Sequence, residues 1–452
     1  MSSAAAFSAT QRMLHGPMLA TLLRLATPNI VGLFAMTLLI GYDGYILGRL
    51  GADALAGIAL VLPLSMLMLQ MSAGGLGGAT TAAVARALGA GQREQASRLA
   101  QHALLIAVAA AAFFTLAEAI AGNRLYAAMG GRGQALADAA AYSGILFGGG
   151  AVIWLTNVLA AIVRGTGNML AASLAVLATT AIHLVLCPLL VFGAGPVPAF
   201  GIAGAAASIL VANAVAALAM VVLLLRPAAA VHLLRWRWRP VAVLFRAILR
   251  VGLPASLNPV ISNASIALAT GYMGSFGTLA VAGYGVAARL EYILVPIAFG
   301  FGSALTAMVA TNMGAGQARR AKQVTWAGAG IVLAVTGLIG VAAALWPGAW
   351  MGIFTTDEAV REAGSRYLRI VGGCYGFFGL GLALFFASQG AGRMLWPLAA
   401  STTRFAVIAV GGWICIRLLA APPAAFFTVV ALSFAAYALT LAVAIRWSNW
   451  ER

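Results

Sequence analysis

Three ionisable residues stand deep inside long apolar runs of the chain: Asp43, His183 and Glu291. A charge at bilayer depth is costly, so an acid or histidine found there binds an ion, relays a proton or has a fixed partner. At ~1.5 Å per helical residue, Asp43 lies about 9 Å and His183 about 15 Å inside the ends of their runs. We interpret all three as candidates for cation or proton coupling.

Asp43 has two explanations. Glycines and tyrosines surround it in the segment 41–45, GYDGY, which favours packing inside the protein beside aromatic rings. A carboxylate in that setting can be tuned to bind a proton or a cation. The alternative is that Asp43 points outward or pairs with Arg49, less than two helical turns away.

His183 and Glu291 each have a structural and a functional explanation as well. A lone histidine in an apolar run is often a hydrogen-bonded structural residue rather than part of a proton pathway. Glu291 has Arg289 only two residues away, a spacing that places the two side chains on different faces of a helix. We therefore expect each to find a partner on another helix or in a water-filled cavity, and both structural pairing and function remain possible.

Further polar residues in apolar runs are candidates for lining a substrate cavity. The amides among them can equally hydrogen-bond between helices, which is the commoner use of such residues in membranes. The full set is Tyr42, Tyr45, Asn157, Asn213, Asn258, Asn263 and Arg289.

The elements that must position these residues are membrane-spanning helices. The chain is 63% hydrophobic and 8% charged, with a mean hydropathy of +0.99. A span needs about 20 apolar residues, and in lipid only helices and closed barrels pair every backbone group. Twelve runs qualify and are too continuous for barrel strands: 25–48, 54–82, 99–121, 138–163, 169–192, 202–225, 251–273, 279–307, 323–346, 365–388, 396–418 and 424–446. We predict an all-α polytopic membrane protein.

A plan repeated at an offset of about 225 residues organises these runs. The GAGQ turn at 89–92 returns at 314–317, and the Gly-x-Gly turn at 165–167 returns at 390–392. Glycine at such places can adopt the left-handed conformation that ends a helix. Because each half holds an even number of runs, six, the repeats insert in the same orientation. This predicts two six-helix lobes related by a pseudo-two-fold axis along the membrane normal.

Three parts follow from the repeat: a first lobe at 1–225, a basic and aromatic cytoplasmic linker at 226–250, and a second lobe at 251–452. Most of the 27 Lys and Arg residues fall on the linker's side of the spans, which by the positive-inside rule places both termini in the cytoplasm. The first 23 residues lack the features of a cleavable signal peptide, so we expect a short cytoplasmic tail. The net charge of +17 then reflects orientation against anionic lipid, and we expect no nucleic-acid partner.

The sequence lacks the residue patterns that metal binding, phosphate binding or catalysis would need. The three cysteines lie in apolar runs without ligand spacing, so we read them as packing residues and predict no metal site. The glycine turns lack the Lys-Ser/Thr of a phosphate-binding loop, and no catalytic cluster is visible. We expect no enzyme activity and no cofactor; the partners are small-molecule substrates and membrane lipids, and the chain acts as a monomer.

The ordered motifs resemble the multidrug and toxic compound extrusion (MATE) transporters, within the larger group that includes lipid and polysaccharide flippases. The segments that carry the likeness are 43–51, 164–167, 201–206, 282–292 and the paired GAGQ turns. The resemblance implies a V-shaped pair of lobes in the plasma (inner) membrane that exchange cationic or amphipathic drug-like compounds for H⁺ or Na⁺. It also implies cation coupling at Asp43 and bending of the first span at Pro28.

Two departures from the family bear on the coupling ion. Sodium-binding members carry Asn and Asp in the fifth span, where this chain has His183 and Cys187. Others carry acids in the seventh span, near Ser262, and in the tenth, where this chain has none at depth. Na⁺ prefers oxygen ligands, so we expect proton coupling through Asp43 with His183, with Na⁺ possible.

The predicted function is therefore secondary active antiport of drug-like compounds by alternating access. The alternative on the same scaffold is a flippase or exporter of a lipid-linked or polyprenyl cargo. Such a cargo carries phosphates and favours a ring of arginines, and the chain offers few at depth, Arg289 and Arg404.

Overall fold

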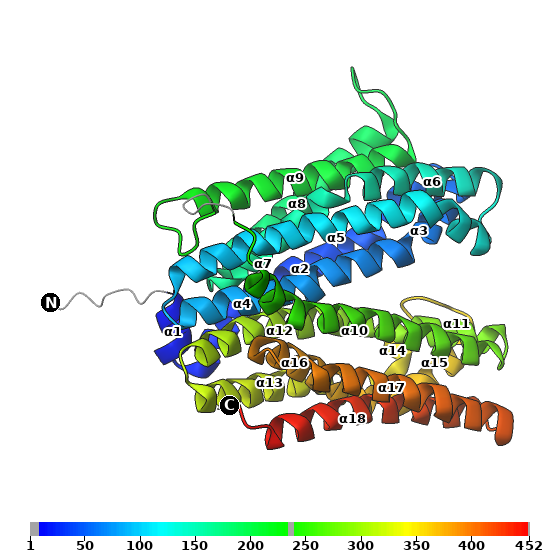
Figure 1. Ribbon diagram of the computed structural model, residues 1–452. Helices are drawn as coiled ribbons and strands as arrows, with labels where there is room; N and C mark the ends of the chain where they lie inside the picture. The colour runs from blue at the N-terminus through cyan, green and yellow to red at the C-terminus, as the bar shows by residue number, and fades with distance from the viewer. Residues whose placement is uncertain (1–8, 234–238, 451–452) are drawn as a thin grey trace. The chain divides into compact units, whose positions relative to one another are not determined.

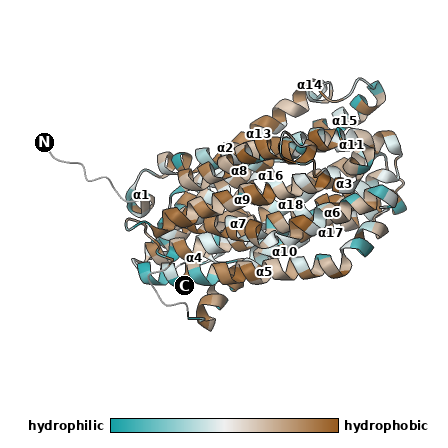
Figure 2. Ribbon diagram, turned by 90° about the horizontal axis from the view of Figure 1, so that it is seen from above, coloured by the Kyte–Doolittle hydropathy of each residue, from teal (hydrophilic) through white to brown (hydrophobic). Residues whose placement is uncertain are grey.

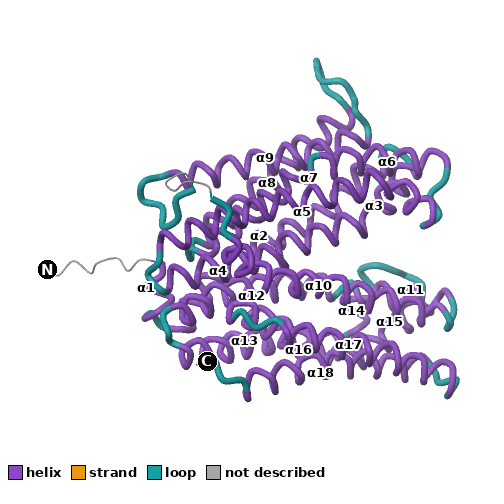
Figure 3. The backbone as a smooth tube through the Cα atoms, viewed as in Figure 1, coloured by secondary structure: helices purple, strands orange, loops and turns teal. Residues whose placement is uncertain are grey.

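The computed structural model describes residues 9–233 and 239–450, and these parts of the chain are mostly helical (Figures 1 and 3). Within them there is no β-strand, only an isolated bridge between Ala194 and Val197. The predicted all-α fold is confirmed. The basic and aromatic run at 235–239 falls almost wholly outside the described residues.

The helices of the first half, with their bounds, are α1 (Ala9–His15), α2 (Met18–Gly48), α3 (Ala52–Gln70), the π-helical turn η1 (Met71–Leu76), α4 (Gly77–Gly89), α5 (Arg93–Ala128), α6 (Gly133–Gly148), α7 (Gly150–Gly165), α8 (Met169–Phe192) and α9 (Ile202–Leu225).

Those of the second half are α10 (Ala242–Gly274), α11 (Thr278–Ala288), α12 (Glu291–Gly314), α13 (Ala318–Leu345), α14 (Pro347–Met351), α15 (Glu358–Val371), η2 (Gly372–Cys374), α16 (Tyr375–Ala391), α17 (Leu395–Trp413), η3 (Ile414–Leu418) and α18 (Pro423–Trp447).

The described residues contain 11 helices, some with short breaks, that are long and apolar enough to cross a membrane. A twelfth span results if α6 and α7, bent by 48° at Gly149, count as one. Figure 2 shows the matching distribution of hydropathy, with hydrophobic residues along the helices and hydrophilic ones concentrated at helix ends and turns. The chain is an integral membrane protein with the predicted set of spans.

The chain forms two compact units. The first consists of Val31–Ser256 and the described residues before Gln11; the second consists of Gln11–Ile30 and Leu257–Arg452, of which the described part ends at residue 450. These bounds differ from the predicted lobes in two places. The start of α2 belongs with the second unit, and the linker with the beginning of α10 belongs with the first.

Specific contacts explain both differences. In the second unit, Asn29 of α2 donates a hydrogen bond to Ser303 of α12 at 2.9 Å. In the first unit, α5 holds the linker, because the Ser97 hydroxyl accepts from the His232 amide at 3.0 Å. One turn later on α5, His102 Nε2 accepts from the amide of Val241 at 2.9 Å.

α2 and α10, the two helices that are divided between the units, occupy equivalent positions in the internal repeat. The unit boundary in α2 follows Ile30, two residues after Pro28, and the boundary in α10 follows Ser256, two residues after Pro254. A proline within a helix removes one backbone hydrogen bond and permits a bend. In both α2 and α10, the repeat thus places a proline two residues before the last residue on the N-terminal side of the unit boundary.

The predicted internal repeat is also visible in side-chain contacts. In the first unit, Thr81 of α4 donates to the carbonyl of Ala161 of α7 at 2.9 Å. In the second, Thr306 of α12 donates to the carbonyl of Phe386 of α16, also at 2.9 Å and across the same 80-residue separation. The two helix pairs are therefore built alike.

The repeated glycines have two roles. Gly91 and Gly316 of the GAGQ turns have φ of 76° and 73°, the left-handed conformation expected where a helix ends. Gly165 and Gly390 instead allow close helix packing. A Cβ at Gly165 would lie 2.9 Å from Cβ of Val84, and one at Gly390 would lie 2.6 Å from a backbone oxygen of α12. Larger residues there would push the paired helices apart.

Candidate functional site

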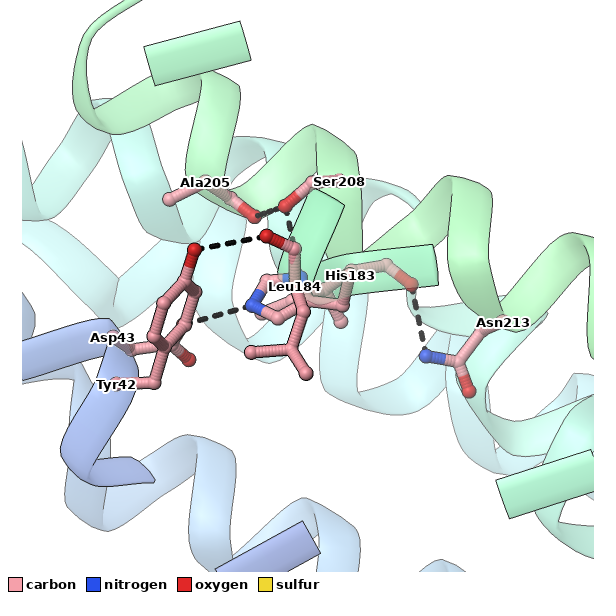
Figure 4. Close-up of polar contacts among 8 residues, drawn as sticks. Tyr42, Asp43, His183, Leu184, Ala205, Ser208 and Asn213 are labelled. Carbon is pink, nitrogen blue, oxygen red and sulfur yellow. Dashed lines mark hydrogen bonds and ion pairs between the residues drawn. The ribbon is translucent and has the colours of Figure 1, made fainter. Parts of the chain in front are cut away.

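Asp43 and His183 form the centre of the site, which three helices of the first unit assemble (Figure 4). Oδ1 of Asp43, on α2, lies 2.8 Å from Nε2 of His183, on α8. The other ring nitrogen, Nδ1, lies 2.9 Å from the hydroxyl oxygen of Ser208, on α9. Both ring nitrogens of the buried His183 therefore have a hydrogen-bond partner, as buried polar atoms usually do.

A second bond fixes α2 against α8 beside this pair. Pro188 has no amide hydrogen, so the carbonyl of Leu184, four residues earlier on α8, lacks its usual helical donor. The hydroxyl of Tyr42 donates to that carbonyl at 2.8 Å. Tyr42 immediately precedes Asp43, so this bond positions the carboxylate over His183.

The surroundings of the pair are largely apolar and contain few charges. The side chain of His183 is 3% exposed and that of Asp43 is 20% exposed, so Asp43 is the less buried member of the pair. Tyr42, Tyr142 of α6 and Cys187 of α8 lie close enough to interact with the carboxylate's charge. Arg49 does not pair with Asp43; its guanidinium stacks on the ring of Phe192 at 5.2 Å.

Cys187 completes a group of metal-ligand type. Ligand atoms of Asp43, His183 and Cys187 lie within 4.8 Å of one another, the one such group within the described residues. Two ligands of a tetrahedral zinc ion, each at ~2.1 Å from it, stand about 3.4 Å apart. The 2.8 Å between Asp43 and His183 is instead a hydrogen-bond distance. The geometry is that of a proton-sharing pair, and we assign no metal here.

The order of elements around this site matches a known transporter family. The MatE family pattern matches residues 28–189 and again residues 254–414, one match in each half of the repeat. The chain belongs to the MatE family. Both matches begin at the prolines near the two unit boundaries, Pro28 and Pro254.

Individual relatives agree with this assignment. The chain is 27% identical to a FAD transporter of Shewanella oneidensis, over 83% of this chain and 82% of that one. It is 22% identical to the multidrug export protein MepA of Staphylococcus aureus, over 78% and 77%. A solved outward-facing structure of a multidrug resistance MATE transporter of the MOP superfamily has the same fold, with a TM-score of 0.88, 23% identity and 96% coverage of each chain.

Glu291 lies in the second unit of this MATE protein, apart from the Asp43 pair in its contacts. Its carboxylate accepts a hydrogen bond from Tyr367 of α15 at 3.0 Å. Arg404 of α17 interacts with its charge and is itself 8% exposed, with its guanidinium 4.8 Å from the ring centroid of Phe434. Glu291 thus has a buried polar partner and a buried cation of its own.

The spacing argument assumed that Arg289 and Glu291 share one helix, but Arg289 lies in the break between α11 and α12, and Glu291 begins α12. Arg289 is exposed, and its guanidinium lies 5.4 Å from the ring centroid of Phe354. Tyr45, another candidate for lining a cavity, is 65% exposed and has no hydrogen bond to any other described residue. A role for either residue in substrate binding stays a prediction.

The four candidate amides are used mainly within helices or between neighbouring ones. Asn157 of α7 donates to Ser72 of η1 at 2.8 Å, and Asn258 of α10 accepts from Ser401 of α17. Asn213 and Asn263 each donate to the carbonyl four residues earlier on their own helices. In this MATE protein these amides therefore form hydrogen bonds to backbone carbonyls or between neighbouring helices. Contacts of the four amides with substrate stay predictions.

The roles of Ser208 and Pro188 were not predicted from the sequence. Ser208 follows the segment 201–206, which carries part of the family resemblance, but nothing in the sequence indicates its partner on another helix. Pro188 predicts a helix kink, without the tyrosine that bonds the carbonyl it frees. Cys187 was named only as a departure from the sodium-binding members; its position four residues after His183, on the same helix face, was a further signal.

Proposed function

We propose that this MATE transporter exports amphipathic or cationic drug-like compounds in exchange for protons. The observation that carries the proposal is the direct hydrogen bond between Asp43 and His183. No lysine or arginine contacts the pair within the described residues, so no permanent positive charge holds the carboxylate ionised. Gain or loss of a single proton therefore changes the net charge of the pair between zero and minus one.

The change of charge can act on the first span. Asp43 lies on the part of α2 that packs in the first unit, and the part up to Ile30 packs in the second. A neutral pair has a smaller desolvation cost in a closed, dry site than a charged one. Proton binding thus favours a conformation that is closed around the pair. Alternating access requires a ligand, here the proton, to shift the equilibrium between conformations in this way.

Na⁺ coupling has weaker support. Na⁺ is a hard cation that prefers several oxygen ligands. The groups hydrogen-bonded to the His183 ring supply oxygen from the Asp43 carboxylate and the Ser208 hydroxyl, while the neighbouring Cys187 supplies sulfur. Because His183 and Cys187 occupy the remaining positions, we favour H⁺.

The substrate proposal rests on relatives. MepA and several other relatives are named as multidrug export or resistance proteins, which supports export of drug-like compounds. One observation favours a second candidate, an anionic dinucleotide, because the relative of 27% identity is named a FAD transporter. The phosphates of such a cargo would call for cationic side chains, of which Arg289 is exposed and Arg404 buried.

The orientation is part of the proposal. Lys and Arg residues concentrate at the GAGQ turns, the linker and the chain ends, which supports cytoplasmic termini in the plasma (inner) membrane. We propose that the chain works as a monomer, because the pair and both its supporting bonds lie within one unit of one chain.

Purified protein in proteoliposomes tests the proposal. Ethidium and FAD are supplied separately as cargo, under an imposed H⁺ gradient or an imposed Na⁺ gradient alone. We expect ethidium transport driven by the H⁺ gradient and little response to Na⁺. Transport of ethidium driven only by Na⁺ would overturn the coupling, and transport of FAD without ethidium would replace the first substrate class by the second.

A further inference from the structure

Ser208 is the only hydroxyl bonded to His183 within the described residues, and its geometry sets a condition on where protons can reside. Its oxygen lies 2.9 Å from Nδ1 of His183 and 2.7 Å from the carbonyl oxygen of Ala205, one turn earlier on α9 (Figure 4). A serine hydroxyl carries one proton and two lone pairs. It can donate to the carbonyl or to the ring nitrogen, but not to both at once.

We propose that the Ser208 hydroxyl is a positioning residue that switches between these two acceptors when the Asp43–His183 pair gains or loses its proton. This inference rests on the proposed proton coupling and adds a defined location for the proton. In the state with the added proton, here called the loaded state, Nδ1 of His183 carries a hydrogen. In the state that has lost this proton, the released state, Nδ1 is bare while Nε2 keeps its hydrogen.

The loaded state follows from the donors available. When Ser208 donates to Ala205, its oxygen offers only lone pairs to the ring, so Nδ1 must carry a hydrogen and donate. One further proton then lies between Nε2 and the carboxylate of Asp43. Whether that proton is closer to nitrogen or to oxygen, the pair holds two protons and has no net charge.

The released state uses the same heavy-atom positions. When one proton leaves, Asp43 is a carboxylate, which accepts best from a hydrogen on Nε2. The neutral ring then has a bare Nδ1, and the Ser208 hydroxyl turns from Ala205 to donate to it. The pair holds one proton and a charge of minus one. Between the two states one proton has left the pair for water, the remaining ring hydrogen is on Nε2, and the hydroxyl hydrogen has rotated. Both states stay fully hydrogen-bonded in a site where an unmet polar group is costly.

Other groups near the pair do not replace this hydroxyl. From α2, Tyr42 donates its hydroxyl hydrogen to Leu184. From α6, Tyr142 interacts with the charge of Asp43 but forms no hydrogen bond to His183. From α8, Cys187 lies near both Asp43 and Ser208, but a thiol is a weak donor and acceptor. Ser208 is completely buried, so water does not reach its place.

The first test compares the pH dependence of H⁺-driven ethidium transport in Ser208→Ala, Ser208→Thr and a matched control. Ser433→Ala is that control, because Ser433 is also completely buried and donates to a carbonyl three residues earlier, at 2.6 Å, and it has no hydrogen bond to a ring nitrogen of any described residue. Without the Ser208 oxygen, the loaded state loses the acceptor for a partly charged N–H, which costs more than the loss of a neutral bond. We expect the pH midpoint of Ser208→Ala to move about one unit toward acid, and Ser208→Thr and Ser433→Ala to keep the wild-type midpoint.

The second test needs no variant of Ser208. Full-length protein labelled with ¹⁵N-histidine has four histidines, and His183→Gln identifies the signals of His183. We expect Nδ1 to change from protonated to bare as pH rises, while Nε2 remains protonated. A neutral form with the hydrogen on Nδ1 would overturn the inference, even if Ser208→Ala did not fold.

The two tests separate this inference from the proposed function. Wild-type transport that ignores the H⁺ gradient would overturn proton coupling, and the nitrogen signals would still decide how Ser208 is used. Wild-type transport that follows the gradient, together with an unshifted midpoint in Ser208→Ala, would overturn the switch and leave proton coupling standing.

Discussion

Asp43 and His183 stand 140 positions apart in the chain and meet at 2.8 Å. Each is the other's only ionic partner in the described part of the chain. The carboxylate is the more exposed member and the imidazole is buried. This relationship makes the first unit the place where the coupling chemistry can be tested.

Asp43→Asn should strongly weaken the response to the proton gradient. The amide cannot exchange a proton, and His183 keeps a polar partner, so folding should be preserved. We expect H⁺-driven ethidium uptake into everted vesicles to fall by about tenfold, a typical size for a lost coupling between two ligands. Asp53→Asn, an exposed acid in the first turn of α3, is the control and should transport normally. Wild-type pH-driven transport by Asp43→Asn would remove Asp43 from the mechanism.

Cys187→Ala distinguishes a proton pair from a metal site. The thiol lies near the pair but is not one of its hydrogen-bond partners. We expect H⁺-driven transport by this variant to match wild type, with or without a zinc chelator. Loss of transport in Cys187→Ala, matched by loss in chelator-treated wild type, would instead identify the three side chains as metal ligands. Cys374→Ala, at a cysteine of the second unit, controls for general effects of thiol removal.

Pro28→Ala tests whether the first span must bend where the units divide. Alanine restores an amide that can bond the carbonyl four residues earlier and straightens the helix. We expect an unchanged or higher melting temperature together with slower ethidium transport. Pro63→Ala in α3, a helix that lies entirely in the first unit, should affect transport less. Equal transport by Pro28→Ala and wild type would contradict a hinge at this position.

Glu291→Gln addresses the acid of the second unit. The amide can still accept from Tyr367, but the buried Arg404 loses the opposing charge that it interacts with. We expect a loss of stability on the order of 2 kcal/mol, seen as a lower melting temperature in detergent, with the pH midpoint of transport unchanged. The double variant with Arg404→Gln should recover part of the loss. A shifted midpoint with unchanged melting would show that Glu291 takes part in coupling.

The sequence by itself determined the class of protein, the number of spans and the repeat. Apolar runs of helical length, recurring glycine turns and the bias of basic residues are local signals, and lipid leaves few structures that satisfy the backbone. The same locality explains why Asp43, His183 and Glu291 stood out, because a charge in an apolar run is visible without any contact being known.

Only the tertiary structure decided which of these residues meet. Asp43 is brought to His183 rather than to the neighbouring Arg49 by the packing of α2 against α8, where Pro188 frees a carbonyl for Tyr42. Ser208 gains its importance from one hydrogen bond across helices, which no periodicity encodes. Helices pack through side chains distant in sequence, so partner choice depends on how whole helices cross, and that is set by the fold.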